Sequence, residues 1–282
     1  MDPHPKLRTI IVLSWLIAPL LAAASACGLL VPATYAREVP YYAVQGLGQD
    51  AFDLFVVLPA LLLCLQGLKR GWRPAWHIWG GLILYLIYTF VIYTFSLYFN
   101  ILFLVYCAIL GLSVYAALVF FTGLRPETLL DAYGPKARVK VPAMLLLVIA
   151  AMFCMIWLQE DIPALLSGQL PPSVKAQGLR TNAVHILDLA LVLPGMVITA
   201  VALLRRKAIG FVFAPTLVLF SATMALSIAA LALAMKLKAQ TADWGVTVMF
   251  CVLALVSLGV FVAFERTPTA AAEARRDQHG LR

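Results

Sequence analysis

The stretch AVHILDLALVLPGMVITAVALL, residues 183–204, decides the fold class of this chain. Only His185 and Asp188 within it are ionisable, and the run stops at the basic residues 205–207. A helix needs about 20 consecutive, mainly apolar residues to cross the hydrocarbon core of a bilayer. A lipid-facing barrel strand would instead alternate apolar and polar residues. The stretch therefore predicts a transmembrane α-helix over residues 183–204.

The rest of the chain has the same character. Of its 282 residues, 63% are hydrophobic and 12% are charged, whereas a soluble domain has about 25% charged residues. We therefore expect an all-α integral membrane protein with the lipid bilayer as a partner and no soluble domain. Residues 267–282, which are charged and Ala-rich, are expected to form a disordered cytoplasmic tail. Apolar windows predict eight transmembrane helices, at residues 9–31, 51–68, 76–97, 101–122, 141–158, 183–204, 209–235 and 244–264.

The basic residues predict the orientation. With a cytoplasmic N-terminus, sixteen of the 21 Lys and Arg residues fall in inner segments and five in outer loops. Cytoplasmic loops carry such an excess, so we expect both termini inside and a place in the cytoplasmic membrane. Nucleic acid is not needed to explain the net charge of +8, because the basic residues are scattered without an aromatic stacking platform. The outer residues are Arg37, Lys175, Arg180, Lys236 and Lys238.

The five cysteines stand alone within predicted spans, at positions 27, 64, 107, 154 and 251, and no CxxC pair occurs. Their expected role is that of small apolar packing residues. The segment 24–28, which includes Cys27, resembles a lipoprotein cleavage site, so cleavage of a signal segment is the alternative for the first span. The apolar run continues through Val31, which favours an uncleaved helix.

An internal repeat is the most informative feature. DLFVVLP at 53–59 and DLALVLP at 188–194 share five residues in register, at an offset of 188 − 53 = 135 positions. Upstream, Pro40 and Pro172 each precede a QGL triplet by five residues, at an offset of 132. We therefore predict a tandem duplication, with one four-helix half over residues 1–135 and the other over residues 136–266.

Four spans per half is an even number, so both halves would enter the membrane from the same side. This is the parallel type of repeat, which is related by a pseudo-two-fold axis along the membrane normal and is found in some transporters. We expect equivalent spans to face each other across this axis, with the second and sixth spans at the seam.

The second span of each half opens with two ionisable residues, Asp50 and Asp53 in the first half and His185 and Asp188 in the second. Residues three apart share a helix face, and a carboxylate at lipid depth normally faces a cavity or a partner. We expect His185 to pair with Asp188, and the two aspartates of the first half to face them. Such a group could bind a cation or relay protons; a metal, if bound, would use Asp53, His185 and Asp188. The alternative is that Asp50 and His185 are interfacial and that Asp53 and Asp188 are N-terminal helix charges favoured by the dipole.

Pro59 and Pro194 follow six residues after Asp53 and Asp188. A proline lacks the N–H that would bond to the carbonyl four residues earlier, so each predicts a helix kink. In lipid the freed carbonyl needs a water, an ion or another donor. A kinked, hydrated helix suits a substrate path, and it is equally a packing device.

The third span carries a polar stripe at helical spacing. These residues could line a substrate path; the alternative is hydrogen bonding between helices together with an aromatic belt at the outer interface. The stripe consists of Tyr85, Thr89, Tyr93, Ser96 and Asn100.

The block from Thr181 to Ala190, followed by Leu193-Pro194, resembles one in a family of prokaryotic multi-pass membrane proteins. The layout is similar along most of the chain, including the GQD triplet at 48–50 before the second span. The resemblance implies a multi-pass membrane fold and no particular activity. The positions that match the family pattern are Asn182, His185, Asp188 and Pro194, with Asp50 beside them.

Three classes of function fit these residues. We favour a transporter or channel-like protein for a small solute, cation or proton, with an Asp/His site on the outer side between the halves. A membrane-embedded enzyme with a His–Asp or metal site at the outer leaflet is one alternative, and a non-catalytic accessory or sensor protein is another. No cofactor is indicated, since the chain has no P-loop, dinucleotide GxGxxG, HExxH or GxSxG motif.

Overall fold

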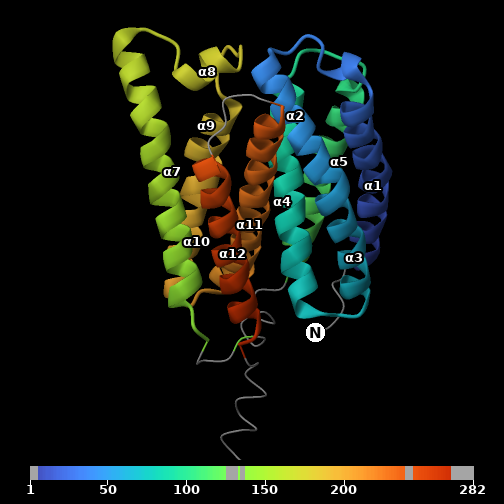
Figure 1. Ribbon diagram of the computed structural model, residues 1–282. Helices are drawn as coiled ribbons and strands as arrows, with labels where there is room; N and C mark the ends of the chain where they lie inside the picture. Colours follow the sequence, from blue (N-terminus) through green and yellow to red (C-terminus); the bar gives the residue numbers. More distant parts are fainter. Residues whose placement is uncertain (1–5, 125–132, 134–136, 239–243, 268–282) are drawn as a thin grey trace, which may run out of the picture.

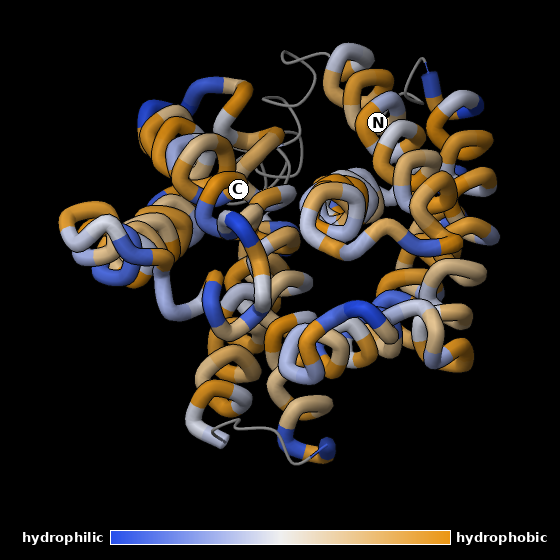
Figure 2. Tube along the Cα trace, turned by 90° about the horizontal axis from the view of Figure 1, so that it is seen from above, coloured by the Kyte–Doolittle hydropathy of each residue, from blue (hydrophilic) through white to orange (hydrophobic). Residues whose placement is uncertain are grey.

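The computed structural model describes residues 6–124, 133, 137–238 and 244–267, and the elements in this part of the chain are all helices (Figure 1). Eight helical spans are long and apolar enough to cross a membrane, which confirms the prediction of a helical, multi-pass membrane protein. Seen from above, the helices run along the line of sight, and hydrophobic residues occur along all of them (Figure 2). The elements are α1 (Leu7–Leu30), η1 (Pro32–Thr34), α2 (Pro40–Phe52), η2 (Asp53–Val57), α3 (Leu58–Lys69), α4 (Arg73–Ser96), α5 (Phe103–Gly123), α7 (Lys140–Ser167), α8 (Pro172–Ala176), α9 (Ala183–Leu187), η3 (Asp188–Val192), α10 (Leu193–Leu204), α11 (Ala208–Leu237) and α12 (Trp244–Glu265).

Two helical spans are longer than predicted. The second was expected over 51–68, but α2, η2 and α3 form one span from Pro40 to Lys69. The polar residues Gln49 and Asp50 ended the apolar window, yet both are buried inside the bundle, where they do not meet lipid. The fifth was expected over 141–158, but α7 continues to Ser167 and ends at Gly168, whose left-handed φ of 65° is a common helix stop.

The irregularity predicted at the two prolines takes the form of a π-helical turn. In η2 the N–H of Leu58 bonds to the carbonyl of Asp53, and in η3 the N–H of Leu193 bonds to the carbonyl of Asp188. A proline is the second residue of both following helices, where its missing N–H is accommodated. The two π turns, and α3 and α10 after them, lie 135 residues apart at both ends, which is the offset of the sequence repeat.

Helices α4 and α11 form the centre of the bundle. They are the most buried of the eight spans, each with 61% of its apolar window buried. They pack against each other, and α11 also packs against α2, α10 and α12. Gly80 and Gly81 allow the close approach, because a Cβ on either would lie 3.0–3.1 Å from Thr216 or Leu219. The expectation that the second and sixth spans meet at the centre is therefore wrong, because the third and seventh spans, α4 and α11, form the centre of the bundle.

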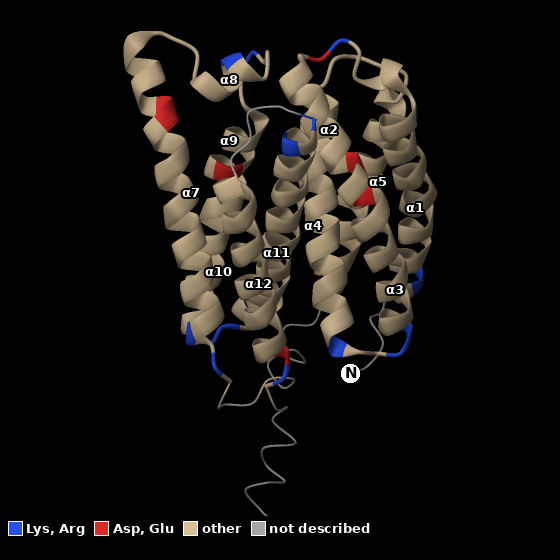
Figure 3. Ribbon diagram, viewed as in Figure 1, with Lys and Arg blue, Asp and Glu red and all other residues tan. Residues whose placement is uncertain are grey.

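The charged residues are distributed unevenly along the helices. In the described part, most Lys and Arg residues lie at the lower end in Figure 3, where the N-terminus lies, and most Asp and Glu residues lie in the upper half. We use "upper end" and "lower end" in this sense. Residues 268–282 of the predicted tail and the predicted boundary at 135/136 lie outside the described residues.

A buried polar cluster lies at the lower end of the bundle. The Glu265 carboxylate lies 3.1 Å from Arg73 Nε and accepts a 2.9 Å hydrogen bond from the Tyr133 hydroxyl. His77 lies 3.1 Å from the same hydroxyl and 3.3 Å from Thr216 Oγ1. These contacts tie the end of α12 to the start of α4.

Candidate functional site

Asp50 is held by two tyrosines from separate parts of the chain. The Tyr35 hydroxyl, from the connection between α1 and α2, donates to Asp50 Oδ2 at 2.5 Å, and the Tyr93 hydroxyl of α4 donates to Oδ1 at 3.1 Å. Burial, and then the nearby Asp50 charge, raise the pKa of the Tyr35 hydroxyl well above its usual value, so this group remains a donor. Helix α1 passes so close that a Cβ at Gly28 would collide with the Asp50 carboxylate. Asp50 is thus enclosed by α1, α2 and α4.

Asp53 lies one turn further on and is completely buried. Its Oδ1 accepts a 2.5 Å hydrogen bond from the Tyr85 hydroxyl and a 3.1 Å bond from the Gln49 amide, and the amide also contacts the Tyr85 hydroxyl. Ser227 of α11 donates to Gln49 Oε1 at 2.8 Å. Asp53 Oδ2 has no hydrogen-bond partner among the described residues.

Asp188 in η3 is bound by residues of two other helices. Its Oδ1 accepts a 3.1 Å bond from the Tyr88 hydroxyl of α4, and its Oδ2 accepts a 2.8 Å bond from the indole N–H of Trp157 in α7. The expected contact of Asp50 and Asp53 with Asp188 is not formed, because the first two bond to Tyr35, Tyr93, Tyr85 and Gln49, and Asp188 bonds to Tyr88 and Trp157. What the aspartates share is α4, which provides hydroxyl groups to all three.

His185 does not form the predicted pair with Asp188. Its Nδ1 lies 2.9 Å from Asp161 Oδ1, its Nε2 lies 3.9 Å from Glu160 Oε2, and its ring stacks on Trp157 at 4.3 Å. The added length of α7 explains the difference, because Glu160 and Asp161 belong to this helix, beyond the predicted end of the fifth span at residue 158. Asn182 caps α9, accepting hydrogen bonds from the N–H groups of residues 184 and 185.

The polar stripe of the third span is only partly continuous. Tyr85 and Tyr93 reach the buried aspartates, and Thr89 and Ser96 face a cavity at the upper end of α4. Asn100 lies beyond the end of α4 at Ser96, so its predicted place on the same helical face is wrong. Its side chain instead accepts a 2.9 Å bond from the N–H of Leu102, just before α5.

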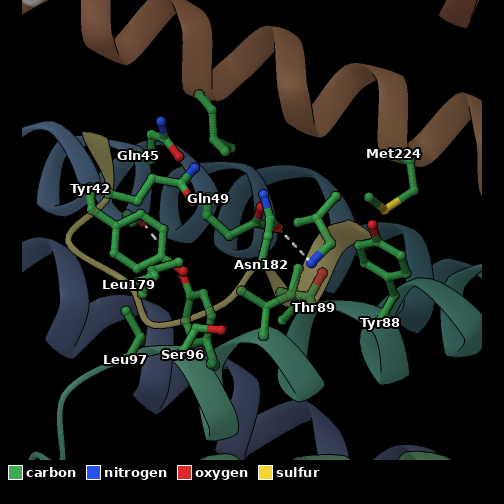
Figure 4. A pocket seen from close by; sticks show the side chains of 17 residues that line it. Tyr42, Gln45, Gln49, Tyr88, Thr89, Ser96, Leu97, Leu179, Asn182 and Met224 are labelled. Carbon is green, nitrogen blue, oxygen red and sulfur yellow. Dashed lines mark hydrogen bonds between the residues drawn. The ribbon is translucent and has the colours of Figure 1, made fainter. Parts of the chain in front are cut away.

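Three cavities lie in a row along α4 and α11. The uppermost, of about 90 Å³, lies between α2, α4, α9 and α11 (Figure 4). The next, of about 300 Å³, shares Gln49, Tyr88 and Val184 with it and reaches Asp188. The third, a groove of about 380 Å³ whose wall includes the exposed side chains of Leu191 and Ile198, shares Tyr88 and Val192 with the second cavity and extends to residues 202 and 209 near the lower ends of α10 and α11. Asp188 is therefore the aspartate of the predicted site that lines a cavity of this row.

The predicted metal-ligand set is not assembled. Asp53 is bonded to Tyr85 and Gln49, His185 to Asp161, and Asp188 to a tyrosine and an indole. Over the described ranges, no three His, Cys, Asp or Glu residues are grouped so that they could hold a metal ion.

The sequence analysis missed several residues of these clusters. Tyr35 and Gln49 lie outside the predicted spans, and Trp157 and Asp161 lie on either side of the predicted end of the fifth span. One signal was available for the last two, since residues 157 and 161 are four apart and share a helix face once α7 is extended.

Comparison with protein families, with curated proteins and with solved structures gives no match to this chain. Its class therefore rests on its own fold. Eight apolar helices define a polytopic α-helical membrane protein, with buried carboxylates in the upper half of its bundle.

Proposed function

We propose that this protein is a transporter that moves a small solute along the row of cavities beside α4 and α11, with Asp188 at the solute site. The main support for this proposal is the position of the row of cavities. The row runs from the upper ends of α2 and α9 to the lower ends of α10 and α11 and passes the buried Asp188 carboxylate. Polar residues within membrane spans that face a cavity are typical of substrate or ion paths.

The proposal includes the orientation and the repeat. The basic lower end would be cytoplasmic, as the positive-inside rule indicates, with both termini there and the protein in the cytoplasmic membrane. The matching π turns support a duplication into parallel halves, whose axis would pass between α4 and α11. Substrate sites at such repeat interfaces are common in secondary transporters.

A membrane-embedded enzyme is the second candidate, because His185 Nδ1 lies 2.9 Å from Asp161 Oδ1. The other ring nitrogen, His185 Nε2, has no hydrogen-bond partner in the described structure. A general base needs space for a reacting group at that nitrogen. His185 lines none of the three cavities described above. The transporter therefore fits the geometry better.

Alternating access is testable without knowing the solute. Ser221 of α11 lines the 300 Å³ cavity, and Ser221→Cys changes its size little. In a background with the five native cysteines replaced by alanine, a membrane-impermeant thiol reagent is applied to right-side-out and to inside-out vesicles. A transporter is expected to expose the thiol of the Ser221→Cys variant to both sides in turn, so labelling should occur in both preparations.

Ser113→Cys is the matched control, because Ser113 is fully buried on α5 and lines none of the three cavities. It should remain unlabelled in both preparations. Labelling of the Ser221→Cys variant from one side alone would contradict transport and favour an enzyme or a sensor.

A further inference from the structure

The walls of the 300 Å³ cavity have an unusual composition for the site of a small polar solute. Apart from Gln49 and Ser221, its polar lining groups all belong to one cluster around Asp188, and the rest of the wall is aliphatic or aromatic. A cavity of this volume lies at the small end of ligand pockets. Five of its lining residues carry aromatic rings: Tyr88, Phe153, Trp157, Phe220 and Phe250.

Asp188 is the one charged residue among the described residues that line this cavity. In the same part of the chain, neither Lys nor Arg lines any of the three cavities, and His185, the neighbouring ionisable group, is bonded to Asp161. Both carboxylate oxygens of Asp188 accept hydrogen bonds, one of them from an indole N–H that can only donate. The described donors around Asp188 therefore match the ionised carboxylate, and no basic side chain of the described residues lines the cavity beside it.

A cation bound in this cavity would gain from two features of its wall. It would neutralise a carboxylate that is costly in apolar surroundings, and the faces of aromatic rings attract cations. An anion would meet the Asp188 charge without a basic lining residue to offset it. A sugar or another polyol would leave most of its hydroxyl groups without partners, because the wall has few polar atoms.

We propose that the cavity binds a lipophilic monocation, such as an aryl-substituted quaternary ammonium ion, with its charge against Asp188 and its apolar part among the aromatic rings. This inference rests on the proposed function, since it names the class of solute for the same site. It specifies a charge and an apolar body, which the row of cavities alone does not.

Matched probes test the charge. Benzyltrimethylammonium and its carbon isostere neopentylbenzene have the same shape and differ by one positive charge. Isothermal titration calorimetry of the full-length protein in detergent micelles, with protein-free micelles as the reference for partitioning, measures both. We expect the cation to bind about tenfold or more tightly than the isostere, as a desolvated ion pair with aromatic contacts allows.

Three variants test whether Asp188 and the aromatic wall cause the preference for the cation. Asp188→Asn keeps the shape of the side chain and should remove the preference for the cation. Phe250→Leu keeps an apolar wall, so it should weaken cation binding a few-fold and change the isostere little, and it tests the proposal even if Asp188→Asn does not fold. Glu38→Gln is the control: it removes a carboxylate that lines none of the three cavities, so it should leave the affinities for both probes unchanged.

The outcomes separate this inference from the transport proposal. Equal affinity for both probes, a cation preference that survives in folded Asp188→Asn, or cation binding that Phe250→Leu leaves unchanged would overturn this inference. If neither probe binds while the Ser221→Cys variant labels from both sides, the cation class fails and transport stands. If the cation binds as expected and that variant labels from one side alone, the site is a cation receptor and transport fails.

Discussion

The Asp50 carboxylate meets three parts of the chain at once: the Tyr35 hydroxyl, the Tyr93 hydroxyl and the backbone of α1 at Gly28. Two hydroxyl donors replace the water that a carboxylate would have outside the bundle. A buried carboxylate that loses a donor incurs the cost of an unmade hydrogen bond, which is larger than the net gain of making one.

Tyr35→Phe removes one of these donors and keeps the ring. We expect the folded protein to lose about 1–3 kcal/mol, because Asp50 is left with Tyr93 alone. Thermal unfolding in detergent measures the change. Tyr98→Phe is the matched control, since the Tyr98 side chain is exposed; equal losses in both variants would show that the Tyr35 hydroxyl does not stabilise Asp50.

Glu38 provides a test through pH. Its carboxylate accepts a 2.7 Å bond from the N–H of Tyr98, and burial raises its pKa above the usual value although this hydrogen bond opposes the shift. A raised pKa means that the folded protein holds the proton more tightly than the unfolded chain does. Protonated Glu38 therefore stabilises the folded protein below the unfolded pKa of about 4.5, and this stabilisation is lost as the pH rises through the folded pKa.

Glu38→Gln removes this titration. We expect the variant to melt at a higher temperature than the wild type at pH 7, and the difference to shrink as the pH falls toward about 4.5, the unfolded pKa. Melting curves between that pH and about pH 8 give the comparison. A difference that stays constant over this range would mean that Glu38 titrates alike in the folded and unfolded states.

At the level of single residues, the sequence identified the buried acids and not their partners. Asp50, Asp53 and Asp188 stand out because charge is rare in apolar helices. Tyr35 and Trp157 could not be assigned to them, because a partner comes from another helix and depends on rotations and depths that one chain pattern does not fix. His185 was given the wrong partner because Asp161, its partner in the structure, lies beyond the predicted end of the fifth span at residue 158.

The π turns are the distinctive local elements. An i→i+5 turn contains one residue more than the α-helical turn it replaces. Deletion of a lipid-exposed residue within such a turn should therefore restore an α-helix and leave the flanking helices in place. Deletion within a regular helix instead rotates everything beyond it by about 100°.

We predict that deletion of Phe55 in η2 or Leu191 in η3 gives folded protein, whereas deletion of Leu63 in α3 or Ile198 in α10 does not. All four side chains are similarly exposed, so loss of packing is matched between the pairs. Size-exclusion profiles and melting temperatures in detergent provide the readout. If all four deletions behave alike, η2 and η3 do not absorb an extra residue.

The number and type of the spans were predictable because roughly 20 apolar residues at helical spacing have few other structures available. Their ends were not. The window that found the second span stopped at Asp50, and the one that found the fifth stopped before Glu160, because hydropathy treats a polar residue as exposed. In this bundle Gln49 and Asp50 point inward, so the helix continues past them.

For the whole molecule, the distribution of charge predicts the orientation. In the cysteine-free background, Gln169→Cys in the exposed connection after α7 should react with an impermeant thiol reagent in intact cells. Trp72→Cys in the exposed connection between α3 and α4 should react only after permeabilisation. The reverse pattern would place the basic end outside and contradict the positive-inside rule for this chain.

The arrangement of the eight spans could be predicted only in part. The repeat predicts which spans correspond, and the π turns keep its offset. It does not specify which pair meets at the centre, since that depends on which helices have small residues for close approach. Gly80 and Gly81 on α4 meet this need, whereas the second and sixth spans were chosen for their aspartates.

Helix α4 touches the acids of both regions. Tyr85 and Tyr93 bond to Asp53 and Asp50 on one side, and Tyr88, about 60° around the helix from Tyr85, bonds to Asp188 on the other. Turning α4 about its own axis would lengthen bonds on both sides in the same motion. Asp53 and Asp188 therefore share one helix as a partner, so a rotation of α4 would change the hydrogen bonds of both aspartates together.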